Sequence, residues 1–190
     1  MWCNADSPCK TMDRLSSTLH HISSQGKVVV VGHSLGGIYA RELARRFSQL
    51  IACAILLGAP IRHPVEAASP CVKALELTAH LMNFAICCHN NGCDLCRPSQ
   101  SELPPPKVPE VIIYSKSDGL VRWQNCIESG PNIKTIEVCS SHCGLPYNPQ
   151  VLRTISEYLD HTSRHLAIVR RSPEHSNRRE GLKWKMHLNG

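Results

Sequence analysis

Long apolar runs and a leader-like start are both missing from this sequence of 190 residues. A membrane-spanning helix needs about 18 or more consecutive apolar residues, and the chain has no such run, so we expect no transmembrane helix. The first residues, Met1–Asp6, have neither the basic nor the apolar stretch of a secretory signal peptide. These two absences favour a cytoplasmic protein with reduced thiols over a secreted or membrane-anchored one.

An excess of one charge is missing from most of the chain, although the formal net charge is +6. The segment from His161 to the end contains seven Arg or Lys and two Glu, so the remainder is close to neutral. We therefore expect no nucleic-acid partner. Residues 162–190 are interpreted as a basic, mostly disordered tail. Solvation of this tail is favoured over contact with a membrane surface, because its apolar residues show little helical periodicity.

Cysteine, in contrast, is abundant, with eleven in the chain. Five potential zinc ligands cluster in one short segment: Cys87, Cys88, His89, Cys93 and Cys96. Zinc sites usually show two well-spaced ligand pairs, and only one regular pair is present here. Disulfides or free thiols are therefore favoured over zinc, and we expect no metal site and no cofactor.

The most informative stretch begins with four valines, Val28–Val31, which predict a strand buried on both faces. The next five residues, Gly32-His-Ser-Leu-Gly36, match the pattern G-x-S-x-G of a sharp strand-to-helix turn that exposes a nucleophilic serine. We expect a side chain at either glycine to collide with the neighbouring element. Residues 38–47 have helix-forming composition and an apolar stripe, so the motif has a strand before it and a helix after it.

The stretch Gly32–Gly37, followed by Tyr-Ala-Arg-Glu, resembles the α/β-hydrolase superfamily on its lipase and esterase side. The resemblance extends from about Lys27 to Leu159. It implies an α/β fold with a mostly parallel sheet flanked by helices. Several strands normally precede the serine motif in this superfamily, and here only one predicted helix does so. The strand at Val28–Val31 is therefore expected to lie at an exposed apolar edge.

The remaining chain supplies further strands and helices for one domain, residues 1–161, before the tail. Apolar runs predict strands at 50–58, 111–115 and 134–138, and helical spacing predicts helices at 12–23 and 148–161. Residues 64–109 lie where this superfamily often inserts a cap, and they form a cysteine-rich, partly helical insert in our interpretation. Cys53 is interpreted as a core residue.

Two loops provide the partners that a nucleophilic serine needs, namely a base and a carboxylate that orients it. Asp118 follows the strand at 111–115, and His142 follows the strand at 134–138. Because parallel strands bring such loops to one edge of the sheet, we predict a catalytic triad of Ser34, Asp118 and His142. Their surrounding segments also resemble the acid and histidine segments of lipases and esterases. Glu110 and Glu137 are weaker candidates for the acid, since both lie in or before strands.

The developing oxyanion needs two hydrogen-bond donors, and the N–H of Leu35 is the first. No His-Gly motif precedes Lys27 to supply the second, and loss of one donor typically costs about 100- to 1000-fold in rate. A fragment, a sheet completed by a partner chain, or an inactive relative would each explain this; we favour a fragment. For His33, the resemblance implies a pocket-lining or structural neighbour of Ser34, not the base.

Together these features predict a serine hydrolase of carboxylic esters that acts on a small-molecule ester or lipid through an acyl-enzyme on Ser34. Residues 64–109 would shape the acyl pocket. The alternatives are a catalytically inactive α/β-hydrolase-like fragment or binding module and, less favoured, an interaction domain stabilised by zinc. Cys126 and Cys143 flank the two catalytic loops and could pair to brace them. The oligomeric state stays open.

Overall fold

The computed structural model describes residues 8–62 and 103–171, with side chains described as far as residue 160. Its elements, in chain order, are α1 (Pro8–Ser23), β1 (Val28–His33), α2 (Leu35–Arg46), β2 (Ile51–Leu57), β3 (Glu110–Tyr114), η3 (Trp123–Asn125), β4 (Ile133–Glu137), η4 (Leu145–Tyr147) and α4 (Pro149–Arg171). Each strand corresponds to an apolar run in the sequence, within one or two residues.

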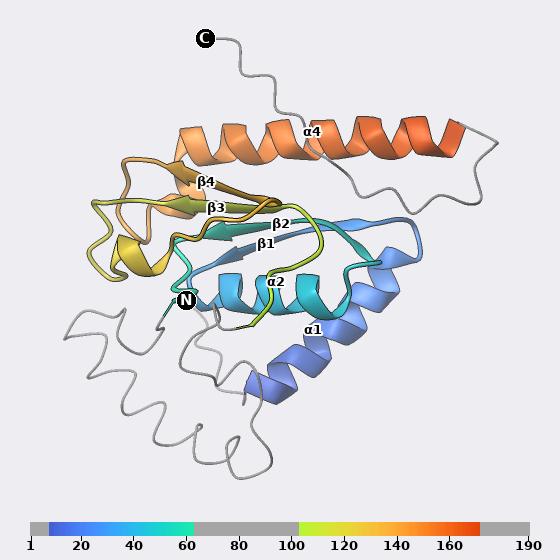
Figure 1. The fold of residues 1–190 in the computed structure, drawn as a ribbon, viewed down its shortest axis with the longest axis horizontal. Helices are drawn as coiled ribbons and strands as arrows, with labels where there is room; N and C mark the ends of the chain where they lie inside the picture. Colours follow the sequence, from blue (N-terminus) through green and yellow to red (C-terminus); the bar gives the residue numbers. More distant parts are fainter. Residues whose placement is uncertain (1–7, 63–102, 172–190) are drawn as a thin grey trace.

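The strands form one parallel sheet in the order β1-β2-β3-β4. Helices α1 and α2 lie on one face of the sheet and α4 on the other (Figure 1). Because neighbouring strands are all parallel, the loops that follow β1, β2, β3 and β4 lie at the same end of the sheet, the carboxyl ends of its strands. The predicted fold class, a mostly parallel α/β sheet flanked by helices, is confirmed.

Two apolar layers hold the helices against the sheet. Residues such as Met12, Leu43 and Ile112 pack between the sheet and helices α1 and α2. Cys53 and Val151 belong to the second layer, between the sheet and α4. Successive strand residues point to opposite faces, so β2 contributes alternately to both layers. Cys53, 1% exposed, is a core residue.

The two edges of the sheet differ in composition. Strand β4 carries polar side chains such as Lys134 and Glu137, which protect an edge against pairing with other chains. Strand β1 has mostly valines, and Val31 is 47% exposed. The expected apolar edge is therefore present, whereas the expectation that β1 is buried on both faces is wrong. Among the described residues, no strand pairs with the outer side of β1.

Helix α4 continues to Arg171, beyond the predicted end at His161. Regular structure therefore extends into residues 162–171, which we expected to be disordered; the backbone continues the helix although the apolar spacing becomes irregular there. Most of the insert, residues 64–102, and the rest of the tail, 172–190, lie outside the described residues. In the part of the chain that is described, no helix is both long enough and apolar enough to cross a membrane.

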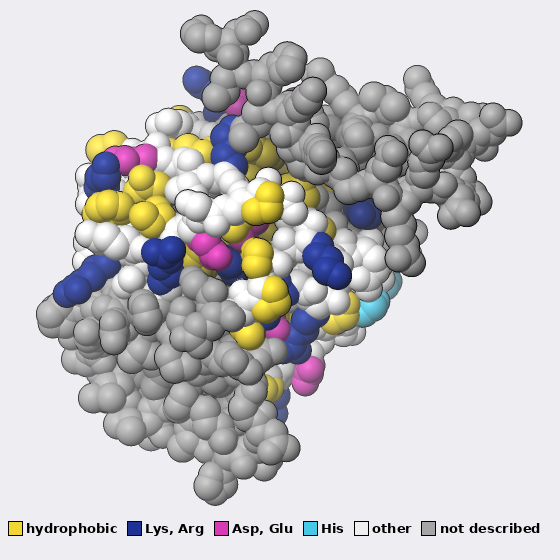
Figure 2. Space-filling model, viewed as in Figure 1, with side chains coloured by type: hydrophobic (Ala, Val, Ile, Leu, Met, Phe, Trp, Pro, Cys, Tyr) yellow, Lys and Arg dark blue, Asp and Glu magenta, His cyan; other side chains and the backbone are white. Residues whose placement is uncertain are grey.

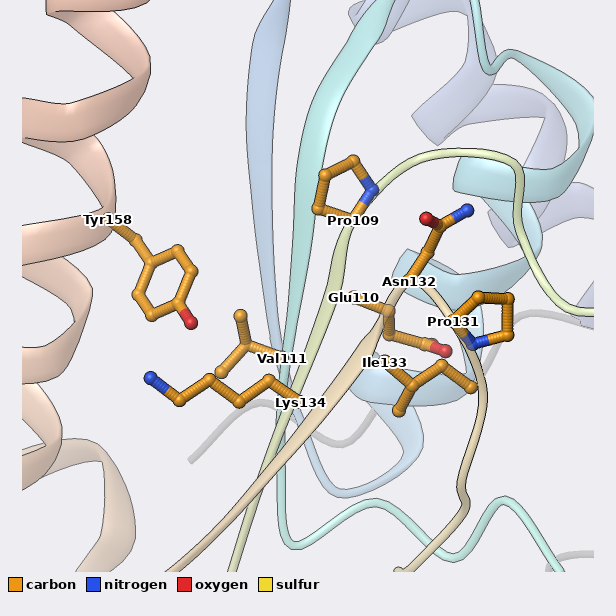
Figure 3. A pocket seen from close by; sticks show the side chains of 8 residues that line it. All are labelled: Pro109, Glu110, Val111, Pro131, Asn132, Ile133, Lys134 and Tyr158. Carbon is orange, nitrogen blue, oxygen red and sulfur yellow. The ribbon is translucent and has the colours of Figure 1, made fainter. Parts of the chain in front are cut away.

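Figure 2 shows Lys and Arg side chains scattered among hydrophobic and acidic ones on one face of the described part. A small pocket opens at the amino ends of β3 and β4 (Figure 3), lined by Pro109, Glu110, Val111, Pro131, Asn132, Ile133, Lys134 and Tyr158. The Lys134 Nζ atom lies 5.5 Å from the centre of the Tyr158 ring. The pocket therefore lies at the amino ends of the strands, whereas the loops that carry Ser34, Asp118 and His142 lie at their carboxyl ends.

Candidate functional site

Ser34 occupies the sharp turn between β1 and α2. Its backbone angles are φ 55° and ψ −124°, and no other non-glycine residue in the described part has a positive φ. Such a conformation costs about 1–3 kcal/mol and persists only where its surroundings enforce it. The Ser34 N–H donates to the Leu57 carbonyl at 2.9 Å, and the hydroxyl makes no capping hydrogen bond to α2. The turn therefore holds the backbone of Ser34 without using its side chain.

Glycines allow the close crossing of β1 and α2, but they are not the pair that we predicted. A Cβ atom on Gly32 would lie 2.1 Å from the Gly36 carbonyl oxygen, so only glycine fits there. A Cβ atom on Gly36 would meet nothing within 4 Å, so the expected collision at Gly36 is wrong. The second close approach is at Gly37, where a Cβ atom would lie 2.4 Å from the Ala59 Cβ.

Asp118 and His142 meet across the loops that follow β3 and β4. The His142 Nδ1 atom lies 2.6 Å from Asp118 Oδ2. The other carboxylate oxygen, Oδ1, accepts the N–H groups of Leu120 at 2.8 Å and Val121 at 2.9 Å. The side chains are 2% exposed for Asp118 and 8% for His142. Both carboxylate oxygens are thus fixed, and the imidazole is oriented through Nδ1, which leaves Nε2 for a second partner.

The environment of Asp118 favours its ionised form. Burial alone would raise the pKa of Asp118, but the hydrogen bonds from the His142 ring and from the Val121 and Leu120 amides lower it. The net pKa lies below the ordinary value of an aspartate. Asp118 is therefore a carboxylate at neutral pH, and it accepts a hydrogen bond from the protonated Nδ1 of His142.

A short segment at the end of β2 connects Ser34 with this pair. Leu57 accepts the Ser34 N–H, as described above, and Gly58 follows it with φ 53°. A Cβ atom on Gly58 would lie 3.2 Å from Asp118 Oδ2 and 3.4 Å from His142 Nδ1. The Ser34 backbone and the Asp118–His142 pair therefore lie beside two consecutive residues at the end of β2.

The two remaining predicted site residues flank the serine. Leu35 is the first residue of α2, where a backbone N–H has no partner one turn earlier in the helix, so this amide suits an oxyanion. His33 contacts His142: its Nε2 lies 3.0 Å from the His142 carbonyl oxygen, and the two rings are 4.6 Å apart. The ring of His33 is thus directed at the histidine loop.

Ser115, at the end of β3, is a site residue that sequence reasoning missed. Its hydroxyl oxygen accepts the N–H of Ser117 in the acid loop and the N–H of Ser140 in the histidine loop, each at 3.1 Å. The residue is 1% exposed. A polar residue directly after an apolar strand is the only sequence signal for this role, because the second contact joins residues distant in sequence.

Replacing Ser115 with alanine should lower the free energy of unfolding by about 1–3 kcal/mol, because two part-buried hydrogen bonds are lost, each worth about 0.5–1.5 kcal/mol. Urea unfolding measures this, and Ser129→Ala, at an exposed position of the same connection, is the matched control. An equal stability of the two variants would contradict the bridging role of Ser115.

The alternative acids lie in other surroundings. Glu137 pairs with Lys116 at 2.8 Å on the surface, and Glu110 lies beside Arg41 at 3.4 Å. Neither is paired with His142. Cys126 and Cys143 are free thiols, so the pairing that the sequence left open is not formed in the structure. Within residues 8–62 and 103–171, no cluster of His, Cys, Asp and Glu could hold a metal ion; the cluster at residues 87–96 lies outside them.

Comparison with known proteins points to one fold. A family model described as the α/β hydrolase fold matches residues 10–78, which include the Ser34 turn. The structure is similar to that of a monoacylglycerol lipase from Paleococcus ferrophilus, with a TM-score of 0.55 at 14% identity, over 82% of this chain and 76% of the lipase. It is also similar to MGS-MChE2, an α/β hydrolase enzyme from the metagenome of lagoon sediments at Mar Chica, Morocco, with a TM-score of 0.53 at 14% identity, over 80% and 71% of the chains. No curated protein matches in sequence.

Proposed function

We propose that the chain is a member of the α/β-hydrolase superfamily and a serine hydrolase of carboxylic esters that works through an acyl-enzyme on Ser34. The observation that carries the proposal is the 2.6 Å contact between His142 Nδ1 and Asp118 Oδ2. This contact lies at the carboxyl ends of the strands, where the strained Ser34 turn also lies. Serine chemistry needs such an oriented base, since a serine hydroxyl alone is a weak nucleophile.

In the proposed reaction, the Ser34 Oγ atom attacks the ester carbonyl carbon and His142 Nε2 accepts the hydroxyl proton. The oxyanion that forms is stabilised by the N–H of Leu35. The C–O bond to the alcohol then breaks, and His142 gives its proton to the departing oxygen. Water repeats the sequence on the acyl-enzyme and releases the acid. Asp118 stabilises the imidazolium in both halves of the cycle.

The substrate class that we propose is a small-molecule ester or a lipid. The monoacylglycerol lipase with the same fold makes esters of fatty acids a reasonable first series. Activity against p-nitrophenyl esters of increasing acyl length would define the preferred chain.

A second proposal, a domain of this superfamily that binds without catalysis, is favoured by the position of β1. Among the described residues, β1 is an edge strand and no earlier strand precedes it. A loop after such a strand would be the expected source of the second oxyanion donor. The two proposals differ in whether Ser34 reacts.

A fluorophosphonate probe tests both. We expect the probe to label the wild-type protein on Ser34 and to leave Ser34→Ala unlabelled, because the phosphorus reacts only with an activated hydroxyl. Mass spectrometry of the labelled peptide measures the site, and Ser129→Ala should label like the wild type. Labelling that persists in Ser34→Ala would contradict the triad, and a folded wild-type protein that does not label would support the binding domain.

A further inference from the structure

His33 is connected to both ends of the proposed proton transfer. It is the last residue of β1 and is bonded through the backbone to Ser34. Its Nε2 atom lies 3.0 Å from the carbonyl oxygen of His142, and its ring lies 4.6 Å from the His142 ring at an angle of 41°. The nucleophile's own strand thus contacts the base through one hydrogen bond and one ring contact.

The chemistry of this hydrogen bond fixes the protonation of His33. A backbone carbonyl can only accept, so Nε2 of His33 must carry the proton and donate. Burial and the nearby His142 lower the pKa of His33, against weaker opposing effects of the backbone hydrogen bond and Asp118. The neutral ring, protonated at Nε2, is therefore the favoured form at neutral pH, and it places no second positive charge beside His142.

We infer that His33 is a positioning residue. Its Nε2–H group donates a hydrogen bond to the His142 carbonyl and so fixes the backbone and ring of His142 relative to Ser34. This inference deepens the proposed function and depends on it. Asp118 orients His142 from the Nδ1 side, as described above, whereas His33 holds the main chain from the side of β1. Of the two roles that the resemblance implied, pocket-lining or structural neighbour, the inference specifies the second.

The physical reason for such a contact is the precision that proton transfer requires. Ser34 and His142 come from loops after β1 and β4, which lie at opposite sides of the sheet in the part of the chain that the structure describes. Small displacements of the strands therefore add up between the two residues. A direct hydrogen bond from the residue before Ser34 to the histidine loop bypasses the intervening strands and limits that displacement.

Three variants separate the donor from the ring. His33→Gln keeps a side-chain N–H that can reach the carbonyl, His33→Phe keeps a ring without a donor, and His33→Ala removes both. We expect His33→Phe and His33→Ala to lower kcat and the rate of fluorophosphonate labelling by about 10- to 100-fold, as displacements of about 1 Å do elsewhere. KM should change little, and His33→Gln should recover most of the rate. His21→Phe, at an exposed position of α1, is the matched control.

A proton NMR spectrum gives a readout that does not depend on activity. The His142 Nδ1 proton, held against Asp118, should give a resonance far downfield that is kept in His33→Gln and broadened or lost in His33→Phe, because the loosened ring exchanges with water. Equal rates and equal resonances in the Gln and Phe variants would overturn the inference, since only packing would then matter. If His33→Phe does not fold, His33→Ala takes its place.

The failure of the proposed function is distinguishable from failure of the inference. A wild-type protein that neither labels nor hydrolyses esters contradicts the proposed function. In that case the downfield resonance still decides whether His33 fixes His142: loss in His33→Phe with retention in His33→Gln supports the positioning role. Retention of the resonance in both variants contradicts it.

Discussion

Replacing Asp118 with asparagine should lower kcat by about 10⁴-fold while KM changes little. The Asp118 Oδ1 atom accepts two backbone N–H groups, so the single oxygen of an asparagine would stay there and its NH₂ group would face His142 Nδ1. An NH₂ group donates, so it would favour the imidazole tautomer with the proton on Nε2. That nitrogen could then no longer accept the Ser34 proton. Steady-state kinetics with a p-nitrophenyl ester measures the loss.

Asp13→Asn, on the exposed side of α1, is the control and should leave kcat unchanged. A loss of less than about 10-fold in Asp118→Asn would contradict the assignment of Asp118 as the orienting acid. Stability gives an independent check. Since the pKa of Asp118 is lowered in the folded protein, its ionisation stabilises the fold above the ordinary aspartate pKa. That contribution is lost as the pH falls through the lowered pKa, and it should be missing in the asparagine variant.

The strands of this fold are predictable from sequence because each is a short apolar run bounded by polar or glycine residues. Leu50–Gly58 and Val111–Ser115 became β2 and β3, the two strands buried in the middle of the sheet. The exposure of Val31 was not predictable from its own run, since four valines look alike in a central strand and at an edge. The end of α4 was missed because helix propensity continues where the apolar spacing does not.

Parts of the candidate site were also accessible from the sequence. Ser34, Asp118 and His142 each follow a strand, and the loops after parallel strands lie at the same end of the sheet, so the sequence predicted that the three residues lie at one end. The contacts of Ser115 and His33 were not accessible. Each joins its residue to a backbone group of another loop, and backbone groups carry no sequence signal. Gly37 was not accessible either, because its need for glycine comes from the side chain of Ala59, which follows β2 and is distant in sequence.

A buried cluster of charged side chains lies between α2 and β3, and the sequence analysis did not predict it. Arg41, two turns after Ser34 on α2, is 0% exposed. Its guanidinium nitrogens lie 2.6 Å from a carboxylate oxygen of Glu128 and 3.4 Å from one of Glu110. Glu128 belongs to the connection that also carries Asp118. The cluster therefore joins α2, the helix that follows Ser34, to the connection between β3 and β4 that carries Asp118.

Arg41→Met should lower the free energy of unfolding by about 3–5 kcal/mol, the cost of leaving buried charge without its partner. Methionine has a similar length and an apolar surface, so the loss reports on the charge more than on packing. Urea unfolding followed by circular dichroism measures it. Arg153→Met, at an exposed position of α4, is the matched control and should change stability by less than about 0.5 kcal/mol.

The pH dependence of the Arg41→Met effect distinguishes a charge cluster from simple packing. Burial raises the pKa of Glu110 to about 7 from an ordinary 4.5, with Arg41 opposing the shift and Glu128 adding to it. A raised carboxyl pKa stabilises the fold fully below pH 4.5, and this contribution is lost as the pH rises through about 7. Without Arg41, the carboxyl group of Glu110 resists ionisation more strongly, so the variant should lose more stability than the wild type between pH 5 and pH 8. A cost that is equal at both pH values would indicate that Arg41 contributes only its apolar stem.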